Sequence, residues 1–408
     1  MKKMILVAYD LNPKWGSEPA KAHNWLKILT NHFFVEVFVR EVNRENIERF
    51  DYGQNVRFNF VRADDFLSKT YQKLKLYNFG NSRFIKKLKP LLIQKTATGE
   101  YSSIHYITPA SILSYNSLYK EIGLPFIVGP LGGGLKTPKH FRKAFNTTEL
   151  FKNYIRIGFY TLLKRKSSFR RFLSNAKAIL IGTEYLLDYI PKSAKSKIHI
   201  VFDTVIDLTE FENIRQEKKH EYTQIVFSGH LSAIKGISLL IDAIKKLKDT
   251  NSEVICRMKV IILGDGTLRR KTEKRIKKYG LTNSISLIGR VGREQALQYL
   301  KESDIFCLPT IRENGGLAIL EAMACGLPVI TSNYGGPKFS INEKCGIKIE
   351  VENYKQYVND LADALEKLIR DENLRKKMGL YARERVRQKF SLQALERKIL
   401  QIYNGILI

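Results

Sequence analysis

Short apolar runs, each bounded by polar or glycine-containing segments, alternate with helical stretches along almost the whole chain. A continuous apolar run of about four to eight residues is typical of a strand that is buried on both faces of a sheet. In the first half, the pattern predicts strands at 5–9, 35–39, 56–61, 104–107, 126–129, 178–181 and 199–202. In the second half, it predicts strands at 225–228, 259–263, 285–288, 305–308 and 328–331. Strands that alternate with helices form parallel sheets with helices on both faces, so we expect an α/β protein.

The pattern starts again after a charged stretch between Glu210 and Glu221. This stretch contains Arg-Gln-Glu-Lys-Lys-His-Glu, so it is predicted to be a surface linker. With 408 residues, the chain is long enough for two domains, each with its own core. From about residue 354 onward the sequence becomes helical and rich in charges.

Two glutamates, Glu313 and Glu321, lie on either side of a predicted helix start that follows strand 305–308. Helix N-termini bind anions, and Gly315 and Gly316 would let a phosphate approach the backbone closely. Carboxylates are poor phosphate ligands but good hydroxyl acceptors, so the combination favours a phosphate flanked by sugars. For Glu313 the macrodipole alone is an alternative explanation. Glu321 has apolar neighbours in sequence and needs a partner from the protein or from a ligand.

The segment that begins at Glu313 reads Glu-Asn-Gly-Gly-Leu-Ala-Ile-Leu-Glu-Ala-Met-Ala-Cys-Gly-Leu-Pro-Val and is followed by Gly335-Gly336-Pro337. It resembles the hallmark of the retaining glycosyltransferases of family 4 (glycosyl transferases group 1), E-x(7)-E followed by Glu-Ala-Met-Ala-x-Gly-x-Pro-Val. Asn314 and Gly315 replace the usual Gly-Phe of that family.

The resemblance implies the GT-B fold, in which two Rossmann-like domains face each other across a cleft and a C-terminal helix crosses back to the first domain. By this resemblance, residues 1–205 would form the acceptor-side domain and residues 206–385 the domain that binds the nucleotide-sugar donor. Residues 386–408 would form the returning helix.

The loop after strand 225–228 reads Gly229-His-Leu-Ser-Ala-Ile-Lys-Gly236 and resembles the family's Gly-Arg-Leu-x-x-x-Lys-Gly, in which Arg and Lys neutralise the diphosphate. Lys235 keeps its charge and would stabilise the leaving group, although a surface lysine is the alternative. His230 stands where Arg is usual. Histidine cannot form the bidentate hydrogen bonds of arginine and is only partly protonated at neutral pH. We therefore expect weaker binding of the phosphate or a contribution from another basic residue.

Three further segments resemble donor-side or active-site loops of the family. Arg290 and Val291 match the segment that borders the nucleobase in the family, and Gly16 lies in a glycine loop similar to family loops that face donor and acceptor. His105 resembles the active-site histidine that contacts the donor sugar. Each also has a structural explanation: a strand-end loop, a tight turn, or a buried histidine with satisfied hydrogen bonds. The glycine-rich stretch 129–134 is expected either to approach a ligand or to form a turn.

The resemblance implies glycosyl transfer with retention of the anomeric configuration. Glu313 would hold hydroxyls of the donor sugar and Glu321 would accept from the ribose. Asn314 and the helix start at Gly315, Gly316 and Leu317 would contact the donor, and this helix start would stabilise the departing diphosphate together with Lys235. A double displacement with Glu313 as nucleophile is the rival mechanism. The chain contains no Asp-x-Asp, so we expect neither a metal nor a cofactor besides the nucleoside diphosphate sugar.

The charge balance adds a possible partner, because 69 Lys and Arg residues face 40 Asp and Glu residues, a net charge of +29. Residues 151–173 hold seven bases and six aromatics without one acid. Such a segment suits an anionic membrane surface, and it would equally suit nucleic-acid phosphates or be a solvated basic face. We favour the membrane, since no recognisable nucleic-acid-binding module is present.

Neither a membrane-spanning apolar run nor a signal peptide is predicted, and the four cysteines show no paired spacing. These features predict a cytoplasmic enzyme that can sit peripherally at the inner face of the cell membrane. Its acceptor would be a glycan or a lipid-linked acceptor in cell-surface polysaccharide synthesis. The alternatives are a sugar-nucleotide epimerase with the GT-B fold and a non-catalytic basic adaptor. A nicotinamide-dependent enzyme is weaker, because Gly-x-Gly-x-x-Gly is absent after both first strands.

Overall fold

The computed structural model describes residues 1–12, 17–63, 77–144, 147–202, 204–211 and 221–407. These residues form two compact units. Unit 1 comprises Met1–Gly134, Ile155–Thr204 and Leu395–Ile408, and unit 2 comprises Leu135–Tyr154 and Val205–Ala394. Most of the expected linker 210–221 lies outside the described residues.

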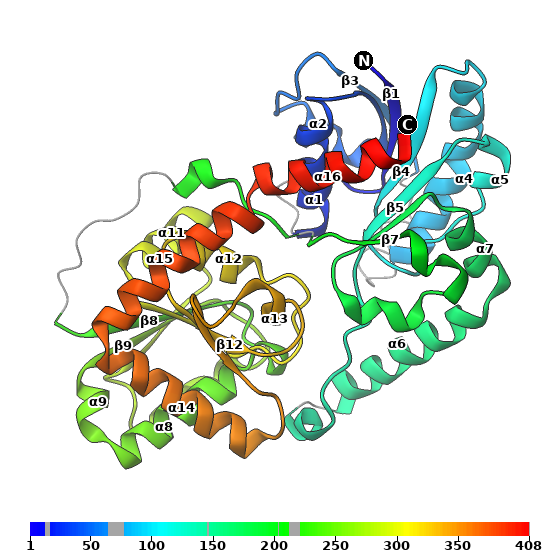
Figure 1. The fold of residues 1–408 in the computed structure, drawn as a ribbon. Helices are drawn as coiled ribbons and strands as arrows, with labels where there is room; N and C mark the ends of the chain where they lie inside the picture. Colours follow the sequence, from blue (N-terminus) through cyan, green and yellow to red (C-terminus); the bar gives the residue numbers. More distant parts are fainter. Residues whose placement is uncertain (13–16, 64–76, 145–146, 203, 212–220, 408) are drawn as a thin grey trace. The chain divides into compact units, whose positions relative to one another are not determined.

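Unit 1 is built on a seven-stranded parallel sheet with the order β3-β2-β1-β4-β5-β6-β7 (Figure 1). Its strands are β1 (Lys3–Ala8), β2 (Phe34–Arg40), β3 (Val56–Val61), β4 (Tyr101–Thr108), β5 (Phe126–Leu131), β6 (Ala178–Ile181) and β7 (Ile198–Ile200). The helices are α1 (Ser17–Leu29), α2 (Arg44–Ile47), α4 (Tyr77–Thr96), α5 (Tyr119–Ile122), α7 (Ser167–Asn175), the end of α6 (Thr147–Arg165) and nearly all of α16 (Leu392–Leu407). β1 lies between β2 and β4 in the sheet, and its residues from Met4 onward are buried, as is typical of a central strand of a parallel sheet with both faces covered.

Unit 2 contains a six-stranded parallel sheet with the order β10-β9-β8-β11-β12-β13. Its strands are β8 (Thr223–Ser228), β9 (Met258–Leu263), β10 (Ile285–Gly289), β11 (Ile305–Leu308), β12 (Val329–Ser332) and β13 (Gly346–Ile349). Its helices are α8 (Ile237–Thr250), α9 (Ser252–Cys256), α10 (Arg269–Lys278), α11 (Arg293–Glu302), α12 (Leu317–Ala324), α13 (Pro337–Ser340), α14 (Tyr354–Arg370) and α15 (Glu372–Lys389).

Each strand predicted from an apolar run is present in the structure, with ends that differ by a few residues. The additional strand is β13, which lies at the edge of the sheet and pairs with β12 alone. Its two middle residues, Ile347 and Lys348, are only partly buried. An edge strand therefore lacks the continuous apolar run that marks the central strands, which explains why the pattern did not predict it.

The segment 135–154 belongs to unit 2, whereas the sequence placed it in the first domain. Phe141 is completely buried, and its ring contacts Tyr354 and Tyr357 of α14, with ring centroids 6.4 and 5.7 Å away. Arg312 also donates from Nη1 to Thr137 Oγ1 at 2.9 Å. These contacts are made by side chains far apart in the sequence, so the apolar pattern alone could not reveal them.

The last helix, α16, packs on unit 1, and the predicted return of the C-terminal helix is thus confirmed (Figure 1). Tyr403 is completely buried, and its hydroxyl donates to His105 Nδ1 at 2.6 Å. Glu396 Oε1 lies 2.7 Å from His32 Nε2. The chain passes into unit 1 at Leu395, later than the expected boundary at residue 386.

Candidate functional site

Two loops of unit 2 meet at the point where its strand order reverses. β8 lies between β9 and β11, so the loops that leave the carboxyl ends of β8 and β11 are neighbours. In open α/β sheets, ligands bind at such a switch point. The loop after β8 carries Lys235, and the loop after β11 carries Glu313. The two segments singled out in the sequence are therefore adjacent in space.

A glycine at the start of α8 lets these loops approach closely. Gly236 has a φ of +73°, and a Cβ atom on it would lie 1.9 Å from the carbonyl oxygen of Pro309. The backbone N–H of Ile311 and the hydroxyl of Thr310 both donate to the carbonyl of Ile234 at 2.9 Å. Only glycine fits this position, and the contact fixes the loop that ends in Lys235.

Lys235 and Glu313 form an ion pair. The ammonium of Lys235 donates to Glu313 Oε2, and the two side chains are 26% and 17% exposed. The other oxygen of Glu313, Oε1, accepts from the backbone N–H of Gly316 at 3.3 Å. Gly316 is the N-cap residue of α12, so the Glu313 carboxylate accepts a hydrogen bond from one of the N–H groups that have no partner within this helix. Any anion that binds here would compete with the carboxylate of Glu313.

The backbone around Glu313 is held by a second glycine turn. A Cβ atom on Gly335 would lie 2.3 Å from the carbonyl oxygen of Glu313, and one on Gly336 would lie 2.0 Å from that of Asn314. The N–H of Gly336 donates to the carbonyl of Glu313 at 2.8 Å. The Gly-Gly-Pro part of the sequence match thus has a physical reason, because only glycines allow this close backbone contact.

Glu321 lies in α12 and finds the partner that its apolar sequence context required. Arg293 donates from Nη1 to Glu321 Oε1 at 2.6 Å and from Nη2 to Glu210 Oε2, also at 2.6 Å. The side chain of Glu321 is 15% exposed. Burial raises the pKa of Glu321, and this effect outweighs the opposite influence of Arg293. Arg293 therefore helps to keep this carboxylate ionised.

Arg293 was missed by the sequence reasoning, which named its neighbour Arg290. The signal was present, since Glu321 required a partner and Arg293 is a base at the first position of α11. However, nothing in the spacing tells which of two nearby bases faces α12.

An open pocket of about 650 Å³ lies at the carboxyl ends of β8, β9 and β10, and this volume is within the range of small-molecule sites. Its lining residues are Ser228, Gly229, His230, Leu263, Gly264, Asp265, Gly266, Arg290, Val291 and Ala296. A Cβ atom on Gly229 would lie 3.9 Å from Lys235 Cδ, and Ala296 follows Arg293 on α11. The structure therefore brings three predicted donor residues, His230, Arg290 and Val291, together in one pocket next to Lys235.

His105 lies in a different environment from the one expected of a residue that contacts sugar. Its side chain is completely buried in unit 1, and its ring centroid is 5.2 Å from that of Trp25. Nε2 lies 2.5 Å from the carbonyl oxygen of Gly129, so it must carry the proton, and Nδ1 accepts from Tyr403. Burial lowers the pKa of His105 to about 4. We correct the prediction: both ring nitrogens are engaged within unit 1, and His105 has a structural role.

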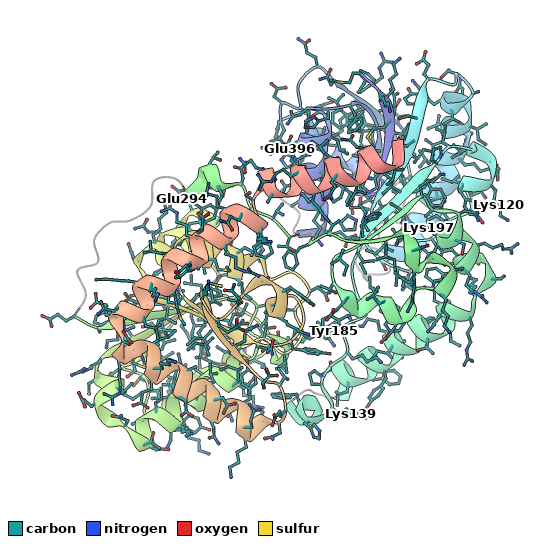
Figure 2. All side chains as sticks on the ribbon, in the orientation of Figure 1. Lys120, Lys139, Tyr185, Lys197, Glu294 and Glu396 are labelled. Atoms are coloured by element: carbon teal, nitrogen blue, oxygen red, sulfur yellow. The ribbon has the colours of Figure 1, made fainter. Side chains whose placement is uncertain are left out.

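Two other features of unit 1 were predicted from the sequence, the loop at Gly16 and the glycine-rich stretch 129–134. Gly16 lies outside the described residues. In the stretch 129–134, a Cβ atom on Gly133 would lie 2.7 Å from the hydroxyl of Tyr160. One on Gly134 would lie 2.5 Å from the carbonyl oxygen of Tyr185, a residue labelled in Figure 2. Close packing against the protein itself accounts for these glycines.

Two kinds of feature are absent from the described residues. Among these residues, no group of three or more His, Cys, Asp or Glu side chains is placed to hold a metal ion. Within the same residues, no helix combines the length and the apolar character that crossing a membrane requires. The cysteines are free thiols, and Cys307, Cys325 and Cys345 are buried.

The part of the chain that carries the pocket and the two ion pairs is similar to known proteins. Residues 209–385 match the family Glycosyl transferases group 1, so the predicted resemblance to this family is confirmed for these residues. An uncharacterized glycosyltransferase of Methanocaldococcus jannaschii is 27% identical over 60% of this chain and 64% of its own length. The poly(ribitol-phosphate) alpha-N-acetylglucosaminyltransferase of Staphylococcus aureus is 26% identical over 66% of this chain and 54% of its own length. The chain thus spans less than two thirds of these curated relatives.

A solved structure establishes the fold over the full length. Anabaena HepE in complex with UDP superimposes with a TM-score of 0.64, covering 99% of this chain and 100% of HepE, at 15% sequence identity. The protein therefore has the GT-B fold that the sequence predicted.

Proposed function

We propose that the protein transfers a glycosyl group from a nucleoside diphosphate sugar to a hydroxyl acceptor, with retention of the anomeric configuration and without a metal. The observation that carries this proposal is the pocket at the carboxyl ends of β8, β9 and β10. Its lining residue Gly229 lies close to Lys235 of the Lys235–Glu313 ion pair, and its lining residue Ala296 shares α11 with Arg293 of the Arg293–Glu321 ion pair. The match of residues 209–385 to a glycosyltransferase family supports it.

The nucleoside would occupy the pocket, with Arg290 and Val291 beside the base and a ribose hydroxyl donating to Glu321. Arg293 donates to Oε1 of Glu321, and we assign the other oxygen, Oε2, to the ribose. Burial of the carboxylate strengthens a hydrogen bond from such a hydroxyl. The diphosphate would then extend past Gly229 toward Lys235.

Binding of the diphosphate would change the Lys235–Glu313 pair. The ammonium would leave Glu313 for the phosphate oxygens, because the diphosphate carries more negative charge than one carboxylate. Glu313 would then be free to accept hydroxyls of the donor sugar. N–H groups at the start of α12, near Gly315 and Leu317, would add partial positive charge at the same end of the phosphate.

In the reaction, the bond between the anomeric carbon and the diphosphate oxygen breaks, and the acceptor oxygen bonds to the same face of that carbon. The acceptor proton passes to the departing phosphate oxygen, so no protein base is required. Lys235 stabilises the charge that develops on the diphosphate. Isolation of a glycosyl ester on Glu313 would replace this scheme by a double displacement.

The relatives support a choice of donor and acceptor. HepE has been solved with UDP, so a uridine diphosphate sugar is the first donor to test. The S. aureus relative acts on poly(ribitol phosphate), which supports a hydroxyl-rich polymer of the cell surface, or its lipid-linked precursor, as the acceptor class.

The first test is the thermal unfolding of the full chain with UDP, GDP, ADP or TDP in EDTA. A ligand present at about 100 times its dissociation constant stabilises the folded state by roughly 2.7 kcal/mol. We expect one diphosphate to stabilise the wild type and Lys235→Ala to need at least about tenfold more of it, since one charged contact is lost. Lys274→Ala, which removes an exposed lysine of α10, is the matched control and should behave like the wild type.

His230→Arg tests the same site in the opposite direction, because a guanidinium can form two hydrogen bonds with the diphosphate. It should tighten nucleotide binding. No response to any of the four diphosphates would contradict the proposal and favour a non-catalytic adaptor. Release of an epimerised sugar without acceptor would indicate an epimerase instead, and a strict requirement for Mn²⁺ would refute metal independence.

A further inference from the structure

Helix α6 carries an unusual concentration of exposed apolar side chains. Five large apolar residues on this helix are exposed: Phe151 (65%), Tyr154 (50%), Ile155 (42%), Phe159 (58%) and Leu162 (65%). Among the described residues, every other helix has at most two such residues. Scattered exposed apolar residues are normal, whereas a contiguous group indicates an interaction surface.

These residues form one stripe. An α-helix advances by about 100° per residue, so Phe151, Ile155, Phe159 and Leu162 fall within an arc of about 80°. Tyr154 widens the stripe to about 140° in the same projection. Tyr160 and Leu163 lie outside this arc and are buried in the core of unit 1. The helix is thus anchored by one side, and a second apolar stripe is left exposed.

The surroundings of the stripe are basic. Exposed cations follow it at the end of α6, at the N-cap of α7 and on α7 itself: Lys164, Arg165, Lys166, Arg170 and Arg171. No acidic residue occurs between 151 and 183. The side chains of this region are drawn in Figure 2.

We propose that α6 docks in the interface of an anionic lipid membrane. Phe151, Ile155, Phe159 and Leu162 would enter the boundary between headgroups and acyl chains, and the cations at the end of α6 and on α7 would contact lipid phosphates. The apolar stripe decides against nucleic acid, because aliphatic residues such as Ile155 and Leu162 offer neither charge nor a stacking face. The cations decide against a neutral lipid surface.

This inference does not rest on the proposed reaction, because nucleotide binding by unit 2 and lipid binding by α6 are measured separately. It does place the enzyme where a lipid-linked acceptor would be found. The same surface would therefore supply a reason for the unequal charge balance of the chain.

The test is flotation of the full chain with vesicles of phosphatidylcholine alone or with about one third phosphatidylglycerol, at low and high salt. We expect binding to the anionic vesicles, at least tenfold weaker binding to the neutral ones, and weakening by salt. Phe159→Ser/Leu162→Ser should reduce binding to anionic vesicles at least tenfold. Lys164→Gln/Arg165→Gln/Lys166→Gln should do the same and should also flatten the salt dependence.

Two control variants separate docking from general effects. Leu380→Ser/Tyr381→Ser removes two exposed apolar residues of α15, and Lys274→Gln/Lys277→Gln/Lys278→Gln removes three exposed cations of α10. Both should bind anionic vesicles within about twofold of the wild type. Thermal unfolding of every variant establishes that the chain is still folded.

A tryptophan at position 159 provides a direct measure of insertion. In Phe159→Trp, brominated lipids should quench the new fluorescence with anionic vesicles only. Full binding by Phe159→Ser/Leu162→Ser, equal binding to neutral vesicles, or equal loss in the α10 control would each overturn the proposal. Salt-sensitive binding of a mixed-sequence RNA that competes with vesicles and survives Phe159→Ser/Leu162→Ser would replace the membrane by nucleic acid.

Discussion

The buried imidazole of His105 should make the stability of unit 1 depend on pH, and His105→Gln should remove this dependence. Burial lowers the pKa of His105 from 6.5 to about 4. Between these two pH values the unfolded chain binds a proton at His105 and the folded chain does not, so stability falls as the pH falls. Above pH 6.5 the histidine is neutral in both states, and no stability is lost.

The size of the effect follows from the difference of about 2.5 between the two pKa values, which corresponds to about 3 kcal/mol. The side chain is completely buried, so solvent screening does not reduce this figure. By pH 4.5 the wild type should have lost about 2.5 kcal/mol of the free energy of unfolding through this residue. Other groups titrate in the same range, and the quantity to compare is therefore the difference between wild type and variant.

The assay is urea unfolding of the full chain at pH 7.5 and at pH 4.5, followed by tryptophan fluorescence. Trp25 contacts the His105 ring and belongs to unit 1. The chain has two tryptophans, and Trp15→Phe therefore makes Trp25 the only reporter. In this background His105→Gln should be less stable than its parent at pH 7.5, by about 1–3 kcal/mol, because ring packing is lost. It should then lose less stability on acidification.

Tyr403→Phe is the matched control. It removes the hydroxyl that donates to His105 Nδ1 but keeps the titrating imidazole, so its pH dependence should resemble that of the parent. Equal losses on acidification in the parent and in His105→Gln would refute the reasoning. They would show that His105 takes up a proton in the folded state as readily as in the unfolded chain. The predicted contact of His105 with the donor sugar would then be the better explanation.

Two further predictions concern unit 2. Gly236→Ala should lower the free energy of unfolding by more than about 2 kcal/mol, measured by urea unfolding, because its Cβ would collide with Pro309 at a positive φ; an unchanged midpoint would contradict the close contact. Arg293→Gln should raise the pKa of Glu321 further and cost about 1–3 kcal/mol at pH 8. The folded variant then retains a proton that the unfolded chain releases, so its stability should fall as the pH rises above 4.5, more steeply than that of the wild type.

The sequence by itself determined the central strands and the family-like loops. A strand buried on both faces must be apolar throughout, so β1, β8 and β11 were visible as runs. Their loops end at the carboxyl edge of a parallel sheet, which is why Lys235 and Glu313 could be expected to lie together. The edge strand β13 was missed because it pairs with one strand only, β12, and its two middle residues are only partly buried. Such a strand does not need a continuous apolar run.

Tertiary structure alone decided which groups face each other over long distances in the chain. The partner of His105 is Tyr403, 298 positions away, and this contact converts an expected sugar-binding residue into a buried structural one. Arg293 reaches Glu321 over 28 positions through the packing of α11 beside α12. Local patterns record burial and turns, because those depend on neighbours in sequence. Hydrogen-bond partners depend on how whole elements pack, and that information is spread over the entire chain.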